Sequence, residues 1–315
     1  MIDRRRFFET VEKCRQMKGP TEKMTIWKDY QLAYSLTEAV EAYQQAEKPV
    51  RFVSGGTDLL LEIQQGSHPT MKTLIDLNHI DEMRELRAMG EQIFIGAAVP
   101  VSQITNSALI KEHAMAVAEA TGLIGGPQVR NSATLGGNVA HALPAADGMI
   151  SLVVMGATAI TYSHSGYSKK KILDLFKGPG ESTLANDEIL VGFEFPVKNS
   201  GEGSAFDRVM RPQGVALPIL NHAVWIRRND DVVEDIRISF GPSGPVPTRA
   251  LLVEDAFRGN KLSDDIISRA KATILETVKF RTSKMRATSE YRYHLAQALL
   301  EKVLRIAWNR AGETE

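Results

Sequence analysis

Two glycine-rich turns carry the strongest chemical signal in the sequence. The first reads Ser54-Gly55-Gly56-Thr57-Asp58, and the second reads Thr134-Leu135-Gly136-Gly137-Asn138. Glycine lets a backbone approach a ligand without a Cβ clash, and consecutive N–H groups ahead of a helix attract an anion. Each turn alone could be a tight turn and nothing more. The two together predict a clamp for the diphosphate of a dinucleotide.

A carboxylate follows the second turn. Asp147 could accept hydrogen bonds from the ribose or ribityl hydroxyls of such a dinucleotide. It could equally cap a helix that starts near Gly148, and both roles can hold at once.

The elements that must position these turns alternate between strand and helix. Apolar spacing predicts helices at 36–46, with Thr37 as N-cap, and at 58–64, and strands at 50–53, 72–77 and 92–97. The first turn then connects a strand to a helix in a small βαβ-like unit. A single amphipathic helix is predicted at 108–120, and the apolar run 150–160 is predicted to be buried.

The second half of the chain has a different pattern. Residues 220–227 and 232–240 alternate as a β-hairpin, and apolar residues then recur every four positions in two helices. The polar stretch 199–204 predicts a domain boundary. We therefore expect an N-terminal extension (1–23), a first domain (24–200) and a second domain (204–315).

Composition excludes several classes of protein. The 315 residues include 38 Lys+Arg and 38 Asp+Glu, so the net charge of zero argues against a dedicated nucleic-acid binder. The single cysteine, Cys14, cannot form an internal disulfide or ligate an iron–sulfur cluster. The seven histidines show no close ligand pair, so no metal site is expected.

The chain gives no signal for a membrane or for export. No apolar run reaches the length of about 18 residues that spans a bilayer, so we expect no transmembrane segment. The start Arg4-Arg5-Arg6 resembles a twin-arginine signal, but charged residues follow where an apolar stretch is needed. A cytoplasmic protein is expected.

The two turns and their flanking residues closely resemble one family. Phe52 to Leu59 and Val129 to Asp147 are similar to the FAD-binding medium subunit of the xanthine dehydrogenase family of molybdenum hydroxylases, which includes aerobic carbon monoxide dehydrogenase. The resemblance covers roughly Lys23 to Trp308, and Gly241 to Ala250 resembles the C-terminal flavoprotein domain of that family. It implies an α+β fold: an FAD-binding domain of the PCMH type, with two α/β subdomains, followed by a domain of antiparallel sheet plus helices.

The resemblance also implies FAD as cofactor and a set of contacts to it. Both turns would bind the diphosphate, Asp147 would bind FAD hydroxyls, Ile124 would lie beside the flavin ring, and Ile189 or Leu190 would lie near the adenine or flavin. Asp207 occupies a place where relatives often carry lysine, so a cationic contact to the flavin falls to Arg208 or Arg211. The implied cofactor-binding set is Phe52, Val53, Ser54, Gly55, Gly56, Thr57, Asp58, Leu59, Ile124, Thr134, Leu135, Gly136, Gly137, Asn138, Asp147, Ile189, Leu190 and Arg208. No catalytic residue and no metal ligand is implied in this chain.

The expected function is that of an electron-transfer subunit. In the family, a molybdopterin-containing large subunit oxidises the substrate, and a small subunit with two [2Fe–2S] clusters passes electrons to the flavin. The terminal acceptor would be NAD, a quinone or oxygen. Two alternatives stay open: a nucleotide-binding or assembly module without redox work, and a free-standing FAD oxidase.

Overall fold

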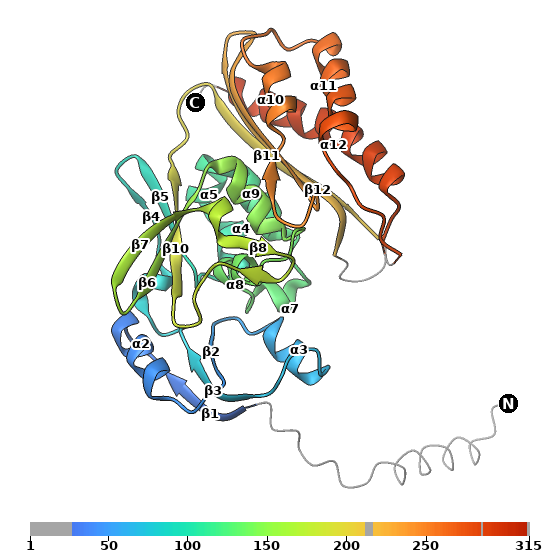
Figure 1. Cartoon of the computed structure of the whole chain (residues 1–315). Helices are drawn as coiled ribbons and strands as arrows, with labels where there is room; N and C mark the ends of the chain where they lie inside the picture. The colour runs from blue at the N-terminus through green and yellow to red at the C-terminus, as the bar shows by residue number, and fades with distance from the viewer. Residues whose placement is uncertain (1–26, 212–216, 285, 314–315) are drawn as a thin grey trace, which may run out of the picture.

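The computed structural model describes residues 27–211, 217–284 and 286–313. The predicted extension 1–23, with Cys14, lies outside these residues. The described chain forms a lower part that holds two α/β units and an upper part built on an antiparallel sheet with three helices (Figure 1).

The first unit is a three-stranded parallel sheet. β3 lies in the middle and pairs in parallel with β1 and with β2. The parallel pairing of β2 with β3 through α3 confirms the βαβ-like unit that carries the first glycine turn. The elements are β1 (Trp27–Leu32), α2 (Leu36–Gln45), β2 (Val50–Val53), α3 (Leu59–Gln64) and β3 (Met71–Asp76).

The second unit is a five-stranded antiparallel sheet in the order β4-β5-β10-β6-β7. Its strands are β4 (Leu86–Met89), β5 (Gln92–Gly96), β6 (Thr158–Ser163), β7 (Gly166–Lys171) and β10 (Ile189–Pro196). Its helices are α4 (Val101–Asn106), α5 (Ala108–His113), α6 (Met115–Gly122), α7 (Pro127–Arg130), α8 (Leu135–Ala140) and α9 (Asp147–Met155). Every residue of α9 is buried, which explains much of the long apolar run in the sequence. Short pieces complete the unit: η1 (Asp81–Arg84), η2 (Ile172–Leu175), β8 (Phe176–Gly178) and β9 (Glu181–Ser182).

The predicted single helix at 108–120 is wrong, because the chain leaves the helical region at Ala114 (φ −149°, ψ 58°). The break gives α6 a separate start, and there the N–H of Ala116 donates to Ser204 Oγ of the C-terminal half at 3.1 Å. The N-cap prediction for α2 is also wrong. Ser35 caps this helix by accepting from the N–H of Glu38, because Thr37 already lies inside the first turn.

The C-terminal half is a four-stranded antiparallel sheet in the order β11-β12-β13-β14, with three helices beside it (Figure 1). The predicted hairpin and the two predicted helices are confirmed. The elements are β11 (Glu202–Met210), β12 (Pro218–Asn229), β13 (Val232–Gly241), β14 (Thr248–Arg249), α10 (Leu251–Phe257), α11 (Asp264–Thr277) and α12 (Ser289–Gly312).

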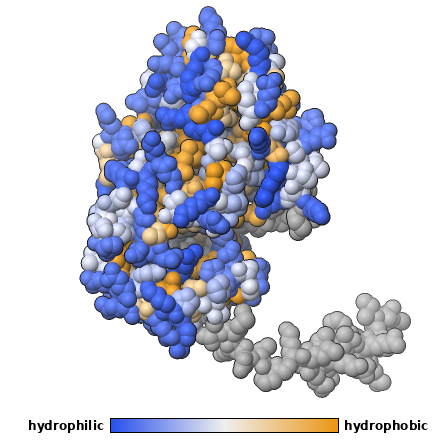
Figure 2. All heavy atoms as spheres, in the orientation of Figure 1, coloured by the Kyte–Doolittle hydropathy of each residue, from blue (hydrophilic) through white to orange (hydrophobic). Residues whose placement is uncertain are grey.

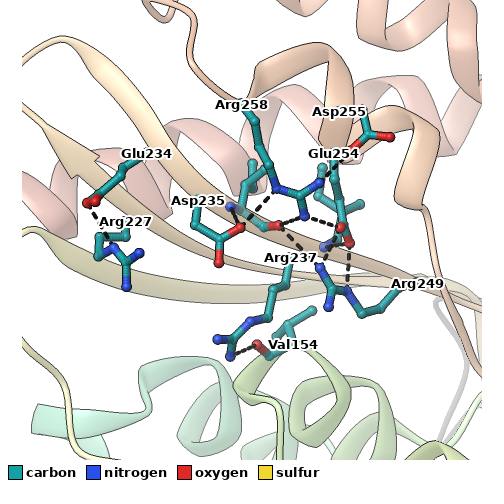
Figure 3. A network of polar contacts seen from close by, with 11 residues as sticks. Val154, Arg227, Glu234, Asp235, Arg237, Arg249, Glu254, Asp255 and Arg258 are labelled. Atoms are coloured by element: carbon teal, nitrogen blue, oxygen red, sulfur yellow. Dashed lines mark hydrogen bonds and ion pairs between the residues drawn. The ribbon is translucent and has the colours of Figure 1, made fainter.

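A buried carboxylate attaches α10 to this sheet. Glu254, with no exposed surface, accepts from Arg249 Nη2 at 2.5 Å, from Arg258 Nη2 at 2.7 Å and from the N–H of Ile238 at 2.9 Å (Figure 3). Arg258 also donates to Asp235 at 2.9 Å. Burial alone would raise the pKa of Asp235, but the hydrogen bonds from Arg258 and from the N–H of Ile236 outweigh it and lower that pKa.

Two hydrophobic cores meet at the C-terminal sheet. One core lies between the sheet and its own helices. The other fills the lower part and includes Phe206, Ala223 and Trp225 from β11 and β12, which face α6 and α9. The expected α+β fold class, with two α/β units followed by a domain of antiparallel sheet plus helices, is confirmed. The boundaries at residues 23–24 and 200–204 stay predictions.

Candidate functional site

The first glycine turn lies against the residues that lead directly into the second turn. A Cβ atom on Gly55 would fall 2.2 Å from the carbonyl oxygen of Ser132 and 2.9 Å from the Cα of Ala133. Only glycine permits this approach of one backbone to the other. The structure therefore brings together two segments that lie far apart in the sequence.

The first turn offers backbone donors. Ser54 Oγ donates to Asn78 Oδ1 at 2.7 Å, and the Asn78 amide donates back to the Ser54 carbonyl at 3.0 Å, which fixes the start of the turn. Gly56 has φ +65°, a left-handed conformation that favours glycine. Within the described ranges, the backbone N–H groups of Gly55, Gly56 and Thr57 have no backbone acceptor. These three half-buried groups fit a diphosphate, because its oxygens only accept hydrogen bonds.

The second turn uses most of its donors within the protein. Thr134 is the N-cap of α8 and accepts from the N–H of Gly137 at 3.1 Å. The N–H of Leu135 donates to the carbonyl of Val99 at 3.4 Å, and that of Gly136 donates to the carbonyl of Ala97 at 3.0 Å. The second turn therefore offers fewer free N–H donors than the first turn. Its main role is to support the first turn, as a platform beneath it.

A histidine that the sequence left without a role joins the two turns. His141 ends α8, and its Nε2 lies 3.3 Å from Glu62 Oε1 while its Nδ1 lies 3.8 Å from Asp58 Oδ2. Both carboxylates belong to the segment that the first turn leads into. The imidazole thus connects the end of α8 to Asp58 and Glu62, beside the place where the diphosphate would bind.

Asp147 lies at the junction between the lower part and the C-terminal sheet. One carboxylate oxygen accepts from Arg208 Nη1, and the other accepts from Asn221 Nδ2 at 2.7 Å. Burial raises the pKa of Asp147 to about 6, although Arg208 and Asn221 both oppose that rise.

Asp147 does not cap the helix, which was one of its two expected roles. Its side chain makes no cap hydrogen bond, and Asn138 Oδ1 instead accepts from the N–H of Gly148 at 3.1 Å. Asn221 was missed from the sequence. The available signal was a polar residue in the middle of an apolar strand, since Asn221 and His222 are both fully buried within β12.

The remaining expected contacts lie around this centre. Ile124 is half-buried in the loop after α6, where Arg130 Nη1 donates to the neighbouring Gly125 carbonyl at 2.7 Å. Ile189 and Leu190 are buried in the main core, which leaves them little surface for a ligand. Val53 is buried, and Phe52 and Leu59 are half-buried beside the first turn. Among the described residues, no group of three or more His, Cys, Asp or Glu side chains could hold a metal ion, and no helix is long and apolar enough to cross a membrane.

The fold and this site define a class of protein that binds the diphosphate of a dinucleotide, and comparison with known families identifies the dinucleotide as FAD. Residues 22–198 match the family described as FAD binding domain in molybdopterin dehydrogenase. Residues 204–307 match the CO dehydrogenase flavoprotein C-terminal domain. The chain belongs to this family of FAD-binding subunits of molybdopterin dehydrogenases, and FAD is its cofactor.

Relatives match along nearly their whole length. The xanthine dehydrogenase FAD-binding subunit of Escherichia coli O157:H7 is 28% identical over 286 residues, which cover 90% of this chain and 97% of the relative. The glyceraldehyde dehydrogenase medium chain of Sulfolobus acidocaldarius is 29% identical and covers 88% of this chain and 96% of its own length. The solved structure of carbon monoxide dehydrogenase from Hydrogenophaga pseudoflava superposes with a TM-score of 0.84 at 26% identity, over 90% of this chain and 97% of that chain.

Proposed function

We propose that this chain carries electrons from the [2Fe–2S] clusters of a partner subunit, through FAD, to a terminal acceptor. The substrate would be oxidised at a molybdenum centre on a further subunit. Bound flavin would supply the ability to accept electrons singly and release them in pairs. The observation that carries this proposal is the contact of Gly55 with the residues that lead into the second turn, which places free backbone donors beside a platform helix in a chain of this family.

In this proposal the chain's own residues bind and shelter the cofactor. The N–H groups of residues 55–57 would hold the diphosphate, with Ser54, Thr57, Asp58 and the platform residues 134–138 around it. Asp147, Ile124, Ile189 and Leu190 would contact the remainder of FAD, as the family resemblance implies. Asp207 forms an ion pair with Lys302 at 2.5 Å and Arg208 is bonded to Asp147, so the exposed Arg211 has more freedom than Arg208 to approach the flavin.

The proposed partners are a molybdopterin-containing large subunit and a [2Fe–2S] small subunit, with NAD, a quinone or oxygen as acceptor, and the proposed location is the cytoplasm. The face of the molecule seen in Figure 2 is mainly hydrophilic, with hydrophobic side chains in small groups. Such a surface agrees with contacts that combine polar and apolar groups.

The test uses the purified chain and its reconstituted complex. The isolated chain should be yellow, and the colour should bleach on chemical reduction. When the complex is given substrate, the flavin should bleach only if the cluster-bearing subunit is present. A colourless chain that does not take up FAD would favour a module without redox work. Substrate oxidation by the isolated chain would favour the free-standing oxidase.

A further inference from the structure

The segment between α11 and α12, together with the first turns of α12, contains positive charges that no carboxylate of the described residues neutralises. Residues 279–292 include five cations, Lys279, Arg281, Lys284, Arg286 and Arg292, and one acidic residue, Glu290. Across the described residues, none of the five forms an ion pair with a carboxylate. Most arginines elsewhere in the described C-terminal half have a carboxylate partner, as do Arg208, Arg227, Arg249, Arg258, Arg269, Arg305 and Arg310. Arg228 and Arg237 instead donate to carbonyl oxygens and lie over the rings of Trp308 and Trp225.

Arg292 is the buried member of this cluster. Its relative exposure is 1%, and its Nε and Nη1 atoms have no hydrogen-bond partner in the part of the chain that the structure describes. A buried guanidinium without a partner is costly, so natural proteins normally supply an anion or a carbonyl oxygen. Burial lowers the pKa of Arg292, and the nearby charges of Arg286 and Arg281 lower it further. The surroundings of Arg292 are therefore positive as well as buried.

Local hydrogen bonds hold these cations in place. Ser289 Oγ donates to the Phe280 carbonyl at 2.8 Å, and the N–H of Ser289 donates to Thr282 Oγ1 at 3.0 Å. Tyr293 OH donates to the Val278 carbonyl at 2.9 Å, and its ring lies edge-on to Phe280 with centroids 5.0 Å apart. The chain that carries the cations is thus fastened to the first turns of α12.

The position adds a helix dipole to the side-chain charges. α12 is 24 residues long, and Arg292 lies in its first turns. The N-terminus of a helix carries a partial positive charge that favours a bound anion. The charges also differ in depth: Arg281 and Lys284 are exposed, Arg286 is half-buried and Arg292 is buried.

We propose that this cluster binds a phosphoryl oxyanion at a site separate from the glycine turns. A single carboxylate from a partner protein offsets one charge, whereas a phosphoryl group carries up to two charges and several oxygens for three guanidinium groups. Arg292 would add its charge from beneath the surface, while the exposed Arg281 and the half-buried Arg286 would contact the phosphoryl oxygens. The phosphoryl group could come from free phosphate or from a nucleotide, and the two sources share the same chemistry.

Calorimetric titration of the full-length, FAD-saturated chain at low ionic strength tests the proposal, because saturation keeps the glycine turns occupied. Inorganic phosphate and NAD are the two probes. We expect at least one of them to bind wild type, and Arg286→Gln to weaken that binding by about tenfold or more, since it removes a charged hydrogen-bond donor. Arg269→Gln is the matched control. Arg269 is exposed, lies on α11 and pairs with Asp265, so its removal should leave the affinity unchanged.

A second variant tests the buried position. Arg292→Met keeps an unbranched, flexible side chain, although a shorter one, and removes the unpaired buried charge, so it should fold. Phosphate should raise the melting temperature of wild type and leave that of Arg292→Met unchanged. If Arg286→Gln weakens the binding of NAD and wild type binds NAD more tightly than phosphate, the source is a nucleotide. If Arg286→Gln weakens only the binding of phosphate, the source is free phosphate, because NAD then binds elsewhere.

Two results would overturn the proposal. One is that neither probe binds to wild type. If Arg286→Gln then weakens assembly with the partner subunits, the cluster binds a carboxylate of a partner instead. The other is equal affinity in Arg286→Gln and Arg269→Gln.

Discussion

Gly55 is the residue on which the contact between the first turn and the residues that lead into the second depends. Gly55→Ala would place a methyl group 2.2 Å from the Ser132 carbonyl oxygen, so the two backbones must separate. Overpacking of this kind costs about 1–3 kcal/mol. We expect FAD to bind about 10- to 100-fold more weakly, measured by fluorescence titration of the apoprotein. Gly178→Ala is the control, because its new methyl group meets only the end of Glu181 at an ordinary 3.4 Å, and unchanged affinity in both variants would contradict the prediction.

The pKa of Asp147 predicts that the stability of the protein depends on pH. Its folded pKa of about 6 lies above the ordinary value of 3.8, so the folded state binds the proton more tightly than the unfolded state. The contribution of this group to stability is therefore fully present below about pH 4 and is lost as the pH rises through about 6.

The prediction compares wild type with Asp147→Asn, which cannot titrate. When the pH is lowered from 7 to 4.5, the free energy of unfolding of wild type should rise by about 2 kcal/mol relative to that of Asp147→Asn. Urea unfolding of both proteins at the two pH values measures this difference. A difference that does not vary with pH would show that Arg208 and Asn221 hold the carboxylate ionised throughout.

At the scale of elements, α10 depends on one buried carboxylate. Glu254→Gln removes the negative charge that Arg249 and Arg258 share. Arg249 then loses its carboxylate partner, whereas Arg258 keeps Asp235 and Asp255. Breaking a buried ion pair in this way typically costs about 3 kcal/mol, and we expect a loss of that size in urea unfolding. The control is Glu234→Gln, because Glu234 is exposed and pairs only with Arg227 at the surface, where the expected loss is below about 1 kcal/mol. Equal losses of stability in the two variants would show that α10 does not depend on the buried carboxylate of Glu254.

The same elements differ in how well local sequence predicts them. The β12–β13 hairpin and α11 follow from alternation and four-residue spacing, because each buries one face and exposes the other. The break at Ala114 does not follow from local sequence. Ser204, which accepts from the N–H of Ala116 just after the break, lies in the C-terminal half of the chain. The alanine-rich segment itself contains no residue that would end a helix.

At the scale of the whole molecule, a bidentate ion pair joins the two domains. Arg310 of α12 donates to both oxygens of Glu119 in α6, at 2.6 and 3.1 Å, and also to the carbonyl of Ser204. A double-mutant cycle of Glu119→Gln and Arg310→Met should give a coupling energy of about 1–2 kcal/mol. Calorimetry of the single variants should show the two domains unfolding less cooperatively than in wild type. The exposed pair Asp265–Arg269 lies within α11 and should give a coupling of at most about 0.5 kcal/mol, so equal coupling in the two cycles would contradict the prediction.

By itself, the sequence determined the βαβ-like unit, the β12–β13 hairpin, helices α11 and α12, the α+β fold class, the family and the cofactor. These properties are local: strand and helix periods come from neighbouring side chains, and glycine turns show their chemistry in consecutive residues. The tertiary structure alone decided which groups meet. It placed Gly55 on Ser132, His141 between Asp58 and Glu62, and Asn221 on Asp147. It also left the Nε and Nη1 atoms of Arg292 without a hydrogen-bond partner among the residues that it describes. Contacts of this kind join distant parts of the chain, and they depend on packing and burial that neighbouring residues in the sequence do not encode.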